Sequence, residues 1–266
     1  MKAYLSFIKL RLGVGLQYRF AAIAGIATQF FFGAMYVMMY DAYYRSGVST
    51  GMEWQQLVSY VWIQQAFFYL TYFNLMDPDI YDSIVTGQVS YEFIRPINVY
   101  WLWYAKLFAK KIAGAALRFL PVILIASLLP VHYSLKGPAS PESFLLFVIT
   151  LTLGVLLSLG IGMLIYSLMF YTTSSKGIFS VYTVIAEFFA GGVIPIPFMP
   201  EILQKICYLL PFRLSVDLPY RLYAGNISIE EGIQSALVQL IWIFIVIAAG
   251  RIILKNASKK LVVQGG

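Results

Sequence analysis

The stretch FLLFVITLTLGVLLSLGIGMLIY, residues 144–166, decides the class of fold because it contains no Asp, Glu, Lys or Arg. About 20 consecutive apolar residues in a helix span the hydrocarbon core of a bilayer, which is about 30 Å thick. Other stretches of comparable length and composition occur at residues 20–43, 57–75, 112–131, 178–199 and 233–254. The sequence therefore predicts an all-α integral membrane protein with six transmembrane helices.

The composition of the chain agrees with this class. Of its 266 residues, 60% are hydrophobic and 12% are charged, whereas ordinary soluble domains have about 45–50% apolar and about 25% charged residues. The net charge of +7 fits the excess of Lys and Arg on the cytoplasmic side of membrane proteins better than it fits nucleic-acid binding. With only Cys207 and His132 of their kinds, the chain has neither a disulfide framework nor a Cys/His metal cluster.

The distribution of basic residues predicts the orientation in the membrane. With the N-terminus inside, five of the 19 Lys and Arg residues fall in outer loops and Arg118 falls within a span, which leaves thirteen on the inner side. The outer five are Arg45, Lys136, Lys205, Arg213 and Arg221. This imbalance predicts that both termini are cytoplasmic.

The chain is expected to form one transmembrane domain over residues 1–266. Residues 1–18 repeat Leu and Ile at helical spacing, at positions 5, 8, 12 and 16, and this pattern predicts an amphipathic helix on the inner membrane surface. The alternative is an ordinary cytoplasmic start to the first span. Six spans follow within residues 20–254, and residues 255–266 form a cytoplasmic tail.

The cytoplasmic loop between the second and third spans carries ordered signals. Asp77 can cap a helix whose first turn contains Pro78 and Asp79, and Gly87 can end it. Ile80 and Ile84 lie on one face, so the helix is short and amphipathic. After Gly87, apolar positions 89, 91 and 93 alternate with polar positions, and residues 95–96, Arg-Pro, close the run. Such a loop can dock on a partner or rest on lipid headgroups.

Three stretches of this chain resemble the permeases of ABC-2 type exporters. They are the loop with I-x-x-G at residues 84–87 and Arg-Pro-x-Asn at residues 95–98, the proline-rich segment 191–225, and the terminal VVQGG at residues 262–266. The similarity covers essentially the whole chain in length, number of spans and order of loops.

The resemblance implies that residues 79–87 form a coupling helix, which seats in a groove of a cytoplasmic ATPase, and that residues 1–18 form the connecting helix beside it. The residues expected to couple to the ATPase are Asp79, Ile80, Asp82, Ile84, Gly87, Tyr91, Arg95 and Pro96. The chain has no G-x-x-x-x-G-K-[ST] motif, so we expect no cofactor bound by this chain, with ATP and Mg²⁺ held by a partner. The implied partners are two ATPase subunits and a second permease, identical or different, besides membrane lipid.

The fifth predicted span is interrupted by glycine and proline. The apolar piece at residues 202–210 that follows would rise only about 14 Å as a helix, which is too short to cross. A re-entrant hairpin that forms an outer gate is expected, since irregular backbone at membrane depth is tolerated where it lines a cavity; the alternative is a periplasmic loop on the membrane. The expected pathway and gate residues are Glu187, Phe188, Gly191, Gly192, Pro195, Pro197 and Pro200.

Two ionisable residues, Glu187 and Arg118, lie within predicted spans. Charges at this depth are costly and usually face a cavity or a partner. Glu187 is the first candidate for a pathway residue. Arg118 either pairs with it or extends its side chain to the inner interface.

The sequence predicts the permease subunit of an ATP-driven exporter in a bacterial plasma membrane, moving an amphipathic or lipid-like molecule, a drug or a peptide. One alternative is a lipid-diphosphate transferase that would use Asp77, Asp79 and Asp82 to hold a metal. Its second acidic cluster is missing from the sequence. The other is an ATP-independent secondary transporter, for which repeated halves or several intramembrane charges would be expected.

Overall fold

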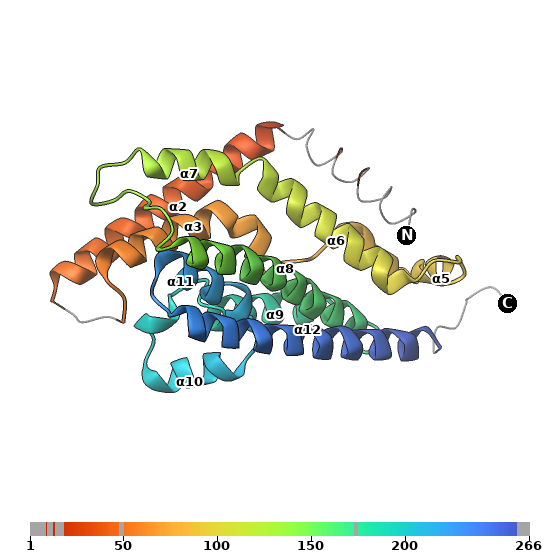
Figure 1. The fold of residues 1–266 in the computed structure, drawn as a ribbon. Coiled ribbons are helices and arrows are strands. Elements are labelled where there is room, and N and C mark those ends of the chain that lie inside the picture. Colours follow the sequence, from red (N-terminus) through yellow and green to blue (C-terminus); the bar gives the residue numbers. More distant parts are fainter. Residues whose placement is uncertain (1–8, 10–12, 14–18, 48–50, 173–174, 260–266) are drawn as a thin grey trace.

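The computed structural model describes residues 9, 13, 19–47, 51–172 and 175–259, and in this part of the chain helices are joined by loops, without strands. Its elements are α2 (Arg19–Arg45), α3 (Trp54–Thr71), α4 (Pro78–Val85), α5 (Val89–Phe93), α6 (Val99–Ala116), α7 (Phe119–Ser127), α8 (Pro141–Met169), α9 (Ser175–Phe189), η1 (Ile196–Phe198), α10 (Glu201–Leu209), η2 (Phe212–Ser215), α11 (Asp217–Ala224) and α12 (Ile229–Ser258) (Figure 1). The predicted helix at residues 1–18 and the VVQGG motif lie outside the described residues, apart from Lys9 and Gly13.

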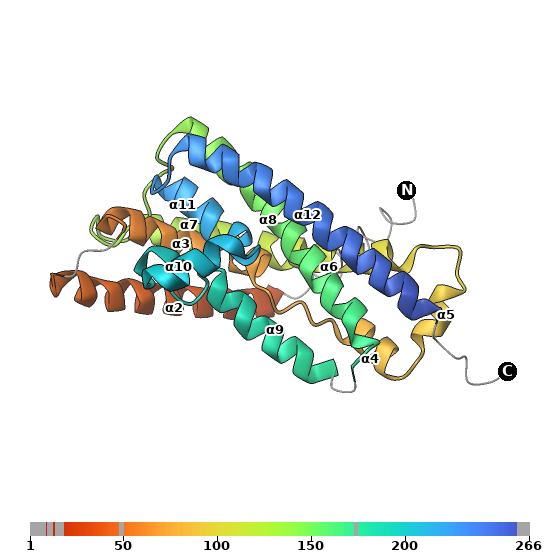
Figure 2. The ribbon, with the colours of Figure 1, turned by 90° about the horizontal axis from the view of Figure 1, so that it is seen from below.

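Among the described residues, three helices are long and apolar enough to cross a membrane: Ala22–Arg45 within α2, Pro141–Met169 and Ile229–Ser258. The last two, α8 and α12, lie side by side along most of their length (Figures 1 and 2). Gln239 of α12 is fully buried there, and its amide donates to the carbonyls of Thr150 (2.9 Å) and Leu214 (2.8 Å). These helices confirm the predicted stretches at residues 20–43, 144–166 and 233–254.

The central helix of the bundle is α3, which packs against α2, α6, α7 and α11. Its side chains are buried almost without interruption from Leu57 to Ala66. The sequence predicted that this span would continue to residue 75, but the helix ends at Thr71. Residues 72–77, which we call the unwound segment, continue as extended chain to α4.

The third predicted span, residues 112–131, is wrong as one continuous helix. It is divided between α6, which already begins at Val99, and α7, with a break at residues 117–118. Pro121 explains the break, because it cannot donate a hydrogen bond to the carbonyl of Leu117 and its ring clashes with that carbonyl in a continuous helix.

Two further segments differ from the sequence pattern. The alternation at residues 88–93 corresponds to one short helix, α5, and not to extended chain. The helix that corresponds to the fifth predicted span, α9, ends at Phe189, ten residues before the predicted end of that span. After it, α10 lies on the outside of the bundle, whereas α11 packs against α3 and α8, with Asp217, Leu218 and Tyr220 almost fully buried (Figure 2).

Candidate functional site at the unwound end of α3

The unwound segment alternates between buried and more exposed residues, and it makes helical backbone hydrogen bonds only at its two ends, from Tyr72 N–H to Phe68 O and from Tyr81 N–H to Asp77 O (both 2.9 Å). Phe73 is 0%, Leu75 5% and Asp77 6% exposed. In a membrane interior, each unpaired backbone group costs on the order of several kcal/mol. Side chains from three other helices, α6, α8 and α9, form hydrogen bonds with backbone groups of the segment.

Lys111 of α6 holds the start of the segment. Its ammonium group donates to the carbonyl oxygens of Leu70 (2.5 Å) and Tyr72 (2.8 Å), and the residue is 3% exposed. The cation thus occupies the position where the last turn of α3 would otherwise leave unpaired carbonyls.

Glu187 of α9 binds the next peptide unit. Its Oε1 accepts a hydrogen bond from the backbone N–H of Phe73 at 2.6 Å, in the same peptide unit as the Tyr72 carbonyl that Lys111 binds. Arg118 lies elsewhere, with its guanidinium centre 4.7 Å from the ring centroid of Tyr69. The pairing of Glu187 with Arg118 that the sequence suggested is therefore not formed among the described residues.

Tyr166 of α8 binds the end of the segment. Its hydroxyl donates to the carbonyl of Leu75 (2.9 Å) and accepts from the N–H of Asp77 (2.6 Å). The segment is thereby bonded to α6, α8 and α9 within six residues.

The helix that follows, α4, is attached to α6 by charge. Lys106 of α6 lies 2.7 Å from Asp77 Oδ1 and 2.7 Å from Asp79 Oδ2, and Lys110 lies 3.6 Å from Asp77 Oδ2. Asp77 also caps α4, since its Oδ1 accepts from the N–H of Ile80 at 3.3 Å. The predicted start of this helix, with Asp77 as the cap and Pro78 in the first turn, is confirmed.

The predicted coupling residues divide into two groups. Ile80 is 1% exposed and Ile84 is half-buried, so both pack inward. The others face outward: Asp79, Asp82, Gly87, Tyr91, Arg95 and Pro96. Three apolar residues of the loop are exposed, Val85 (56%), Tyr91 (65%) and Ile94 (79%), and we call them the loop face.

The predicted gate begins directly after Glu187, where α9 ends at Phe189. Gly191 has a left-handed φ of 81°, and its carbonyl accepts from the Tyr60 hydroxyl at 3.2 Å. The carbonyl of Gly192 accepts from the amide of Gln64 at 3.0 Å. Both donors come from α3, so the broken end of α9 is fixed to the same helix that unwinds at its other end.

The remaining predicted gate residues lie in the chain between α9 and α10. Pro195 is buried, Pro197 packs on Gly51, and Pro200 precedes α10. Phe188 is half-buried and stacks edge to face with Phe189 (5.3 Å between ring centroids). Between α2, α3 and the chain around Pro195 there is no volume that a water molecule can enter.

Residues 26–265 match a family described as ABC-2 family transporter protein. The chain belongs to the ABC-2 transporter family. No curated protein matches it. As a member of the ABC-2 family it is a multi-pass membrane transport component without an ATPase site of its own, and the family implies a partnership with an ABC ATPase subunit.

Sequence reasoning missed several residues of this ABC-2 chain that the structure brings together. Lys106 and Lys111 were counted only as inner-side charges, and Tyr60, Tyr166 and Asp217 were not singled out. A signal was present for the lysines, because three of them, at 106, 110 and 111, occur within six residues of a helix that is otherwise apolar. The tyrosines have no such signal, since the chain contains 20 of them.

Proposed function

We propose that this chain is the permease subunit of an ATP-driven exporter, in which α4 and α5 receive the movement of a separate ATPase. The observation that carries the proposal is the attachment of α4 to α6 through Lys106, Asp77 and Asp79. A displacement of α4 by a partner therefore acts directly on α6 and on the unwound segment.

The loop face supports the same proposal. Val85, Tyr91 and Ile94 are exposed on a short amphipathic loop, and exposed apolar residues grouped on one surface are typical of protein interaction sites. Asp77 and Asp79 bind Lys106 of α6. The loop face takes no part in these ion pairs, so it is available for contact with a partner.

The route from loop to gate is short. From α4 the chain passes through the unwound segment. There Glu187, near the C-terminal end of α9, binds Phe73, and α9 ends two residues later, just before Gly191 and Gly192. An ATPase-driven shift of the unwound segment would thus reach the outer gate through α3 and α9. We propose that an amphipathic substrate, such as a drug, a peptide or a lipid-like molecule, leaves through the segment around residues 191–223.

The complete transporter in this proposal has two ATPase subunits, which bind ATP and Mg²⁺, and two permease chains, identical or different. It lies in a bacterial plasma membrane with both termini of this chain in the cytoplasm. The transferase alternative is less well supported, because Asp77 and Asp79 bind Lys106 and Asp77 caps α4, which leaves these carboxylates occupied.

The test is gentle affinity purification of the tagged chain from its native membrane, followed by identification of co-purified proteins that contain a G-x-x-x-x-G-K-[ST] motif. We expect an ATPase with the wild-type chain and at least a tenfold lower yield of it with the Val85→Asp, Ile94→Asp double variant. The control is Val131→Asp, which places a charge at a position 73% exposed beyond α7. Recovery of the chain alone, transporting without ATP, would overturn the proposal.

A further inference from the structure

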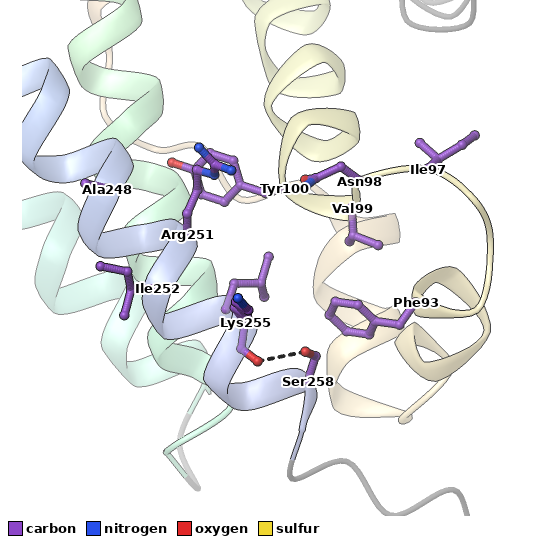
Figure 3. A pocket seen from close by; sticks show the side chains of 11 residues that line it. Phe93, Ile97, Asn98, Val99, Tyr100, Ala248, Arg251, Ile252, Lys255 and Ser258 are labelled. Atoms are coloured by element: carbon purple, nitrogen blue, oxygen red, sulfur yellow. Dashed lines mark hydrogen bonds between the residues drawn. The ribbon is translucent and has the colours of Figure 1, made fainter.

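A pocket of about 650 Å³ lies between the last turns of α12 and the loop that leads into α6 (Figure 3). One wall is formed by residues 248–258 of α12, and the other by Phe93 and residues 97–100. It is separate from the unwound segment and from the outer gate, although the wall formed by α5 and the start of α6 also belongs to the proposed coupling loop.

The walls of the pocket combine positive charge with apolar surface. Arg251 and Lys255 are one helical turn apart, so their side chains leave the same face of α12. Phe93, Val99 and Ile252 supply apolar surface, and no acidic residue is among the described residues that line the pocket. This composition favours a ligand that carries both a negative charge and a hydrocarbon part.

A buried polar group in the pocket has no partner in the described part of the chain. Tyr100 is 3% exposed, and its hydroxyl makes no hydrogen bond there. Its ring rests on Gly250, where an added Cβ would come within 3.1 Å of the ring. An unpaired buried hydroxyl costs about 1–3 kcal/mol in proteins. A ligand oxygen that accepts a hydrogen bond from the Tyr100 hydroxyl would remove this cost.

The pocket lies at the depth of lipid headgroups. The 30 residues of α12 rise about 45 Å, which exceeds the hydrocarbon core of about 30 Å, and its first turn carries Glu230 and Glu231. In the predicted orientation, Arg251 and Lys255 therefore reach the inner headgroup layer. Trp101, a residue type typical of that layer, lies beside Arg251, with 5.8 Å from the guanidinium centre to the ring centroid.

We infer that this pocket binds one anionic phospholipid of the cytoplasmic leaflet. Arg251 and Lys255 bind the phosphate, and the Tyr100 hydroxyl donates to one of its oxygens. The first carbons of the acyl chains lie against Phe93, Val99 and Ile252. Basic pockets between transmembrane helices on the cytoplasmic side suit such headgroups. Binding here does not require the ATPase, so it can be tested apart from the proposed function.

The experiment is native mass spectrometry of the purified, detergent-solubilised chain, titrated with phosphatidylglycerol or with phosphatidylcholine of the same acyl chains. We expect one phosphatidylglycerol retained at low micromolar lipid and no comparable retention of phosphatidylcholine. Millimolar inorganic phosphate should leave the retained lipid in place, because the acyl contacts are absent from the free anion. Displacement by phosphate would show a simple anion site and would overturn the proposal.

Three variants distinguish lipid binding in this pocket from nonspecific attraction of lipid to the charged surface. The double variant Arg251→Gln, Lys255→Gln should weaken binding by roughly 20-fold, given about fivefold per basic residue near anionic lipid. Ala248→Phe keeps both charges and places a bulky ring in the pocket, so it should also weaken specific retention. Tyr100→Phe removes only the hydroxyl and should weaken binding several-fold.

The matched control removes two charges elsewhere. Lys176→Gln with Lys205→Gln alters exposed residues that do not line the pocket, and this variant should bind phosphatidylglycerol as the wild type does. Equal loss in this control, or undiminished binding in Ala248→Phe, would refute the site. Circular dichroism and the thermal midpoint of each variant verify that it is folded.

Discussion

At the residue scale, the buried ammonium group of Lys111 lies between two carbonyl oxygens of α3 and its extension, with the Glu187 carboxylate nearby. Removing one partner of a buried charged group leaves the others uncompensated, which typically costs about 3–5 kcal/mol. We therefore expect Lys111→Met to lower the stability of the purified chain by about this amount, measured as a fall in its thermal unfolding midpoint. Lys110→Met is the matched control. Its side chain is 42% exposed and its hydrogen bond to Met76 is 3.3 Å long, so it should cost less than about 1 kcal/mol.

The coupling between Lys111 and Glu187 can be measured in the same assay. Glu187→Gln keeps an oxygen that accepts from Phe73 but removes the charge. The double variant Lys111→Met, Glu187→Gln should therefore be more stable than Lys111→Met alone, by on the order of 1 kcal/mol. If the two losses simply add, the electrostatic role assigned to the pair is wrong.

At the scale of elements, the end of α4 depends on Gly87, which has a left-handed φ of 76° and open space around the position of a Cβ. Gly87→Ala should cost about 1–2 kcal/mol of local backbone strain and loosen the junction of α4 with α5. We expect ATP-dependent transport in proteoliposomes with the ATPase to fall several-fold. Gly47→Ala is the control, since Gly47 has a φ of 78° and is equally open but lies at the end of α2. Equal loss of transport in both variants would show that strain alone, and not the position of α4, is responsible.

The elements that hydropathy could predict are those whose environment is uniform along their length. The stretches at residues 144–166 and 233–254 lie within helices only a few residues longer, because lipid and neighbouring helices surround them throughout. The division of the third span was not predicted, because a hydropathy average does not register that Pro121 breaks the helix in the preceding turn. The position of the unwound segment was also missed. Residues 72–77 contain neither glycine nor proline, and their conformation depends on Lys111, Tyr166 and Glu187, which are far away in the sequence.

Of the site, the sequence predicted only the features that depend on neighbouring residues in the chain. The cap at Asp77 and the short helix after it follow from local chemistry, so the sequence sufficed for them. The ion pairs of Lys106 with Asp77 and Asp79 join residues 27 and more positions apart, and no local pattern specifies them. The resemblance to ABC-2 permeases identified the loop, but the contacts behind it required the fold.

At the scale of the whole molecule, the predicted orientation can be tested with cysteine chemistry. Cys207 is the only cysteine and is 0% exposed, so the wild-type chain should not react with a membrane-impermeant maleimide. In intact cells we expect Lys136→Cys, in the outer loop before α8, to be labelled. Gln88→Cys, in the loop between α4 and α5, should be labelled only after the membrane is permeabilised. Both positions are exposed, so the reverse pattern would place the loop face outside and exclude an ATPase contact there.

The hydrogen bonds of the unwound segment have a consequence for the kind of movement this transporter can make. A regular helix keeps its own bonds when it tilts, so it can move by any small amount. Residues 72–77 instead share their bonds among α6, α8 and α9, and a partial shift would break some of them without forming others. The segment is therefore expected to change position in a single cooperative step. One ATP-driven movement would then give one complete switch of state, with few partly open intermediates through which solutes could leak.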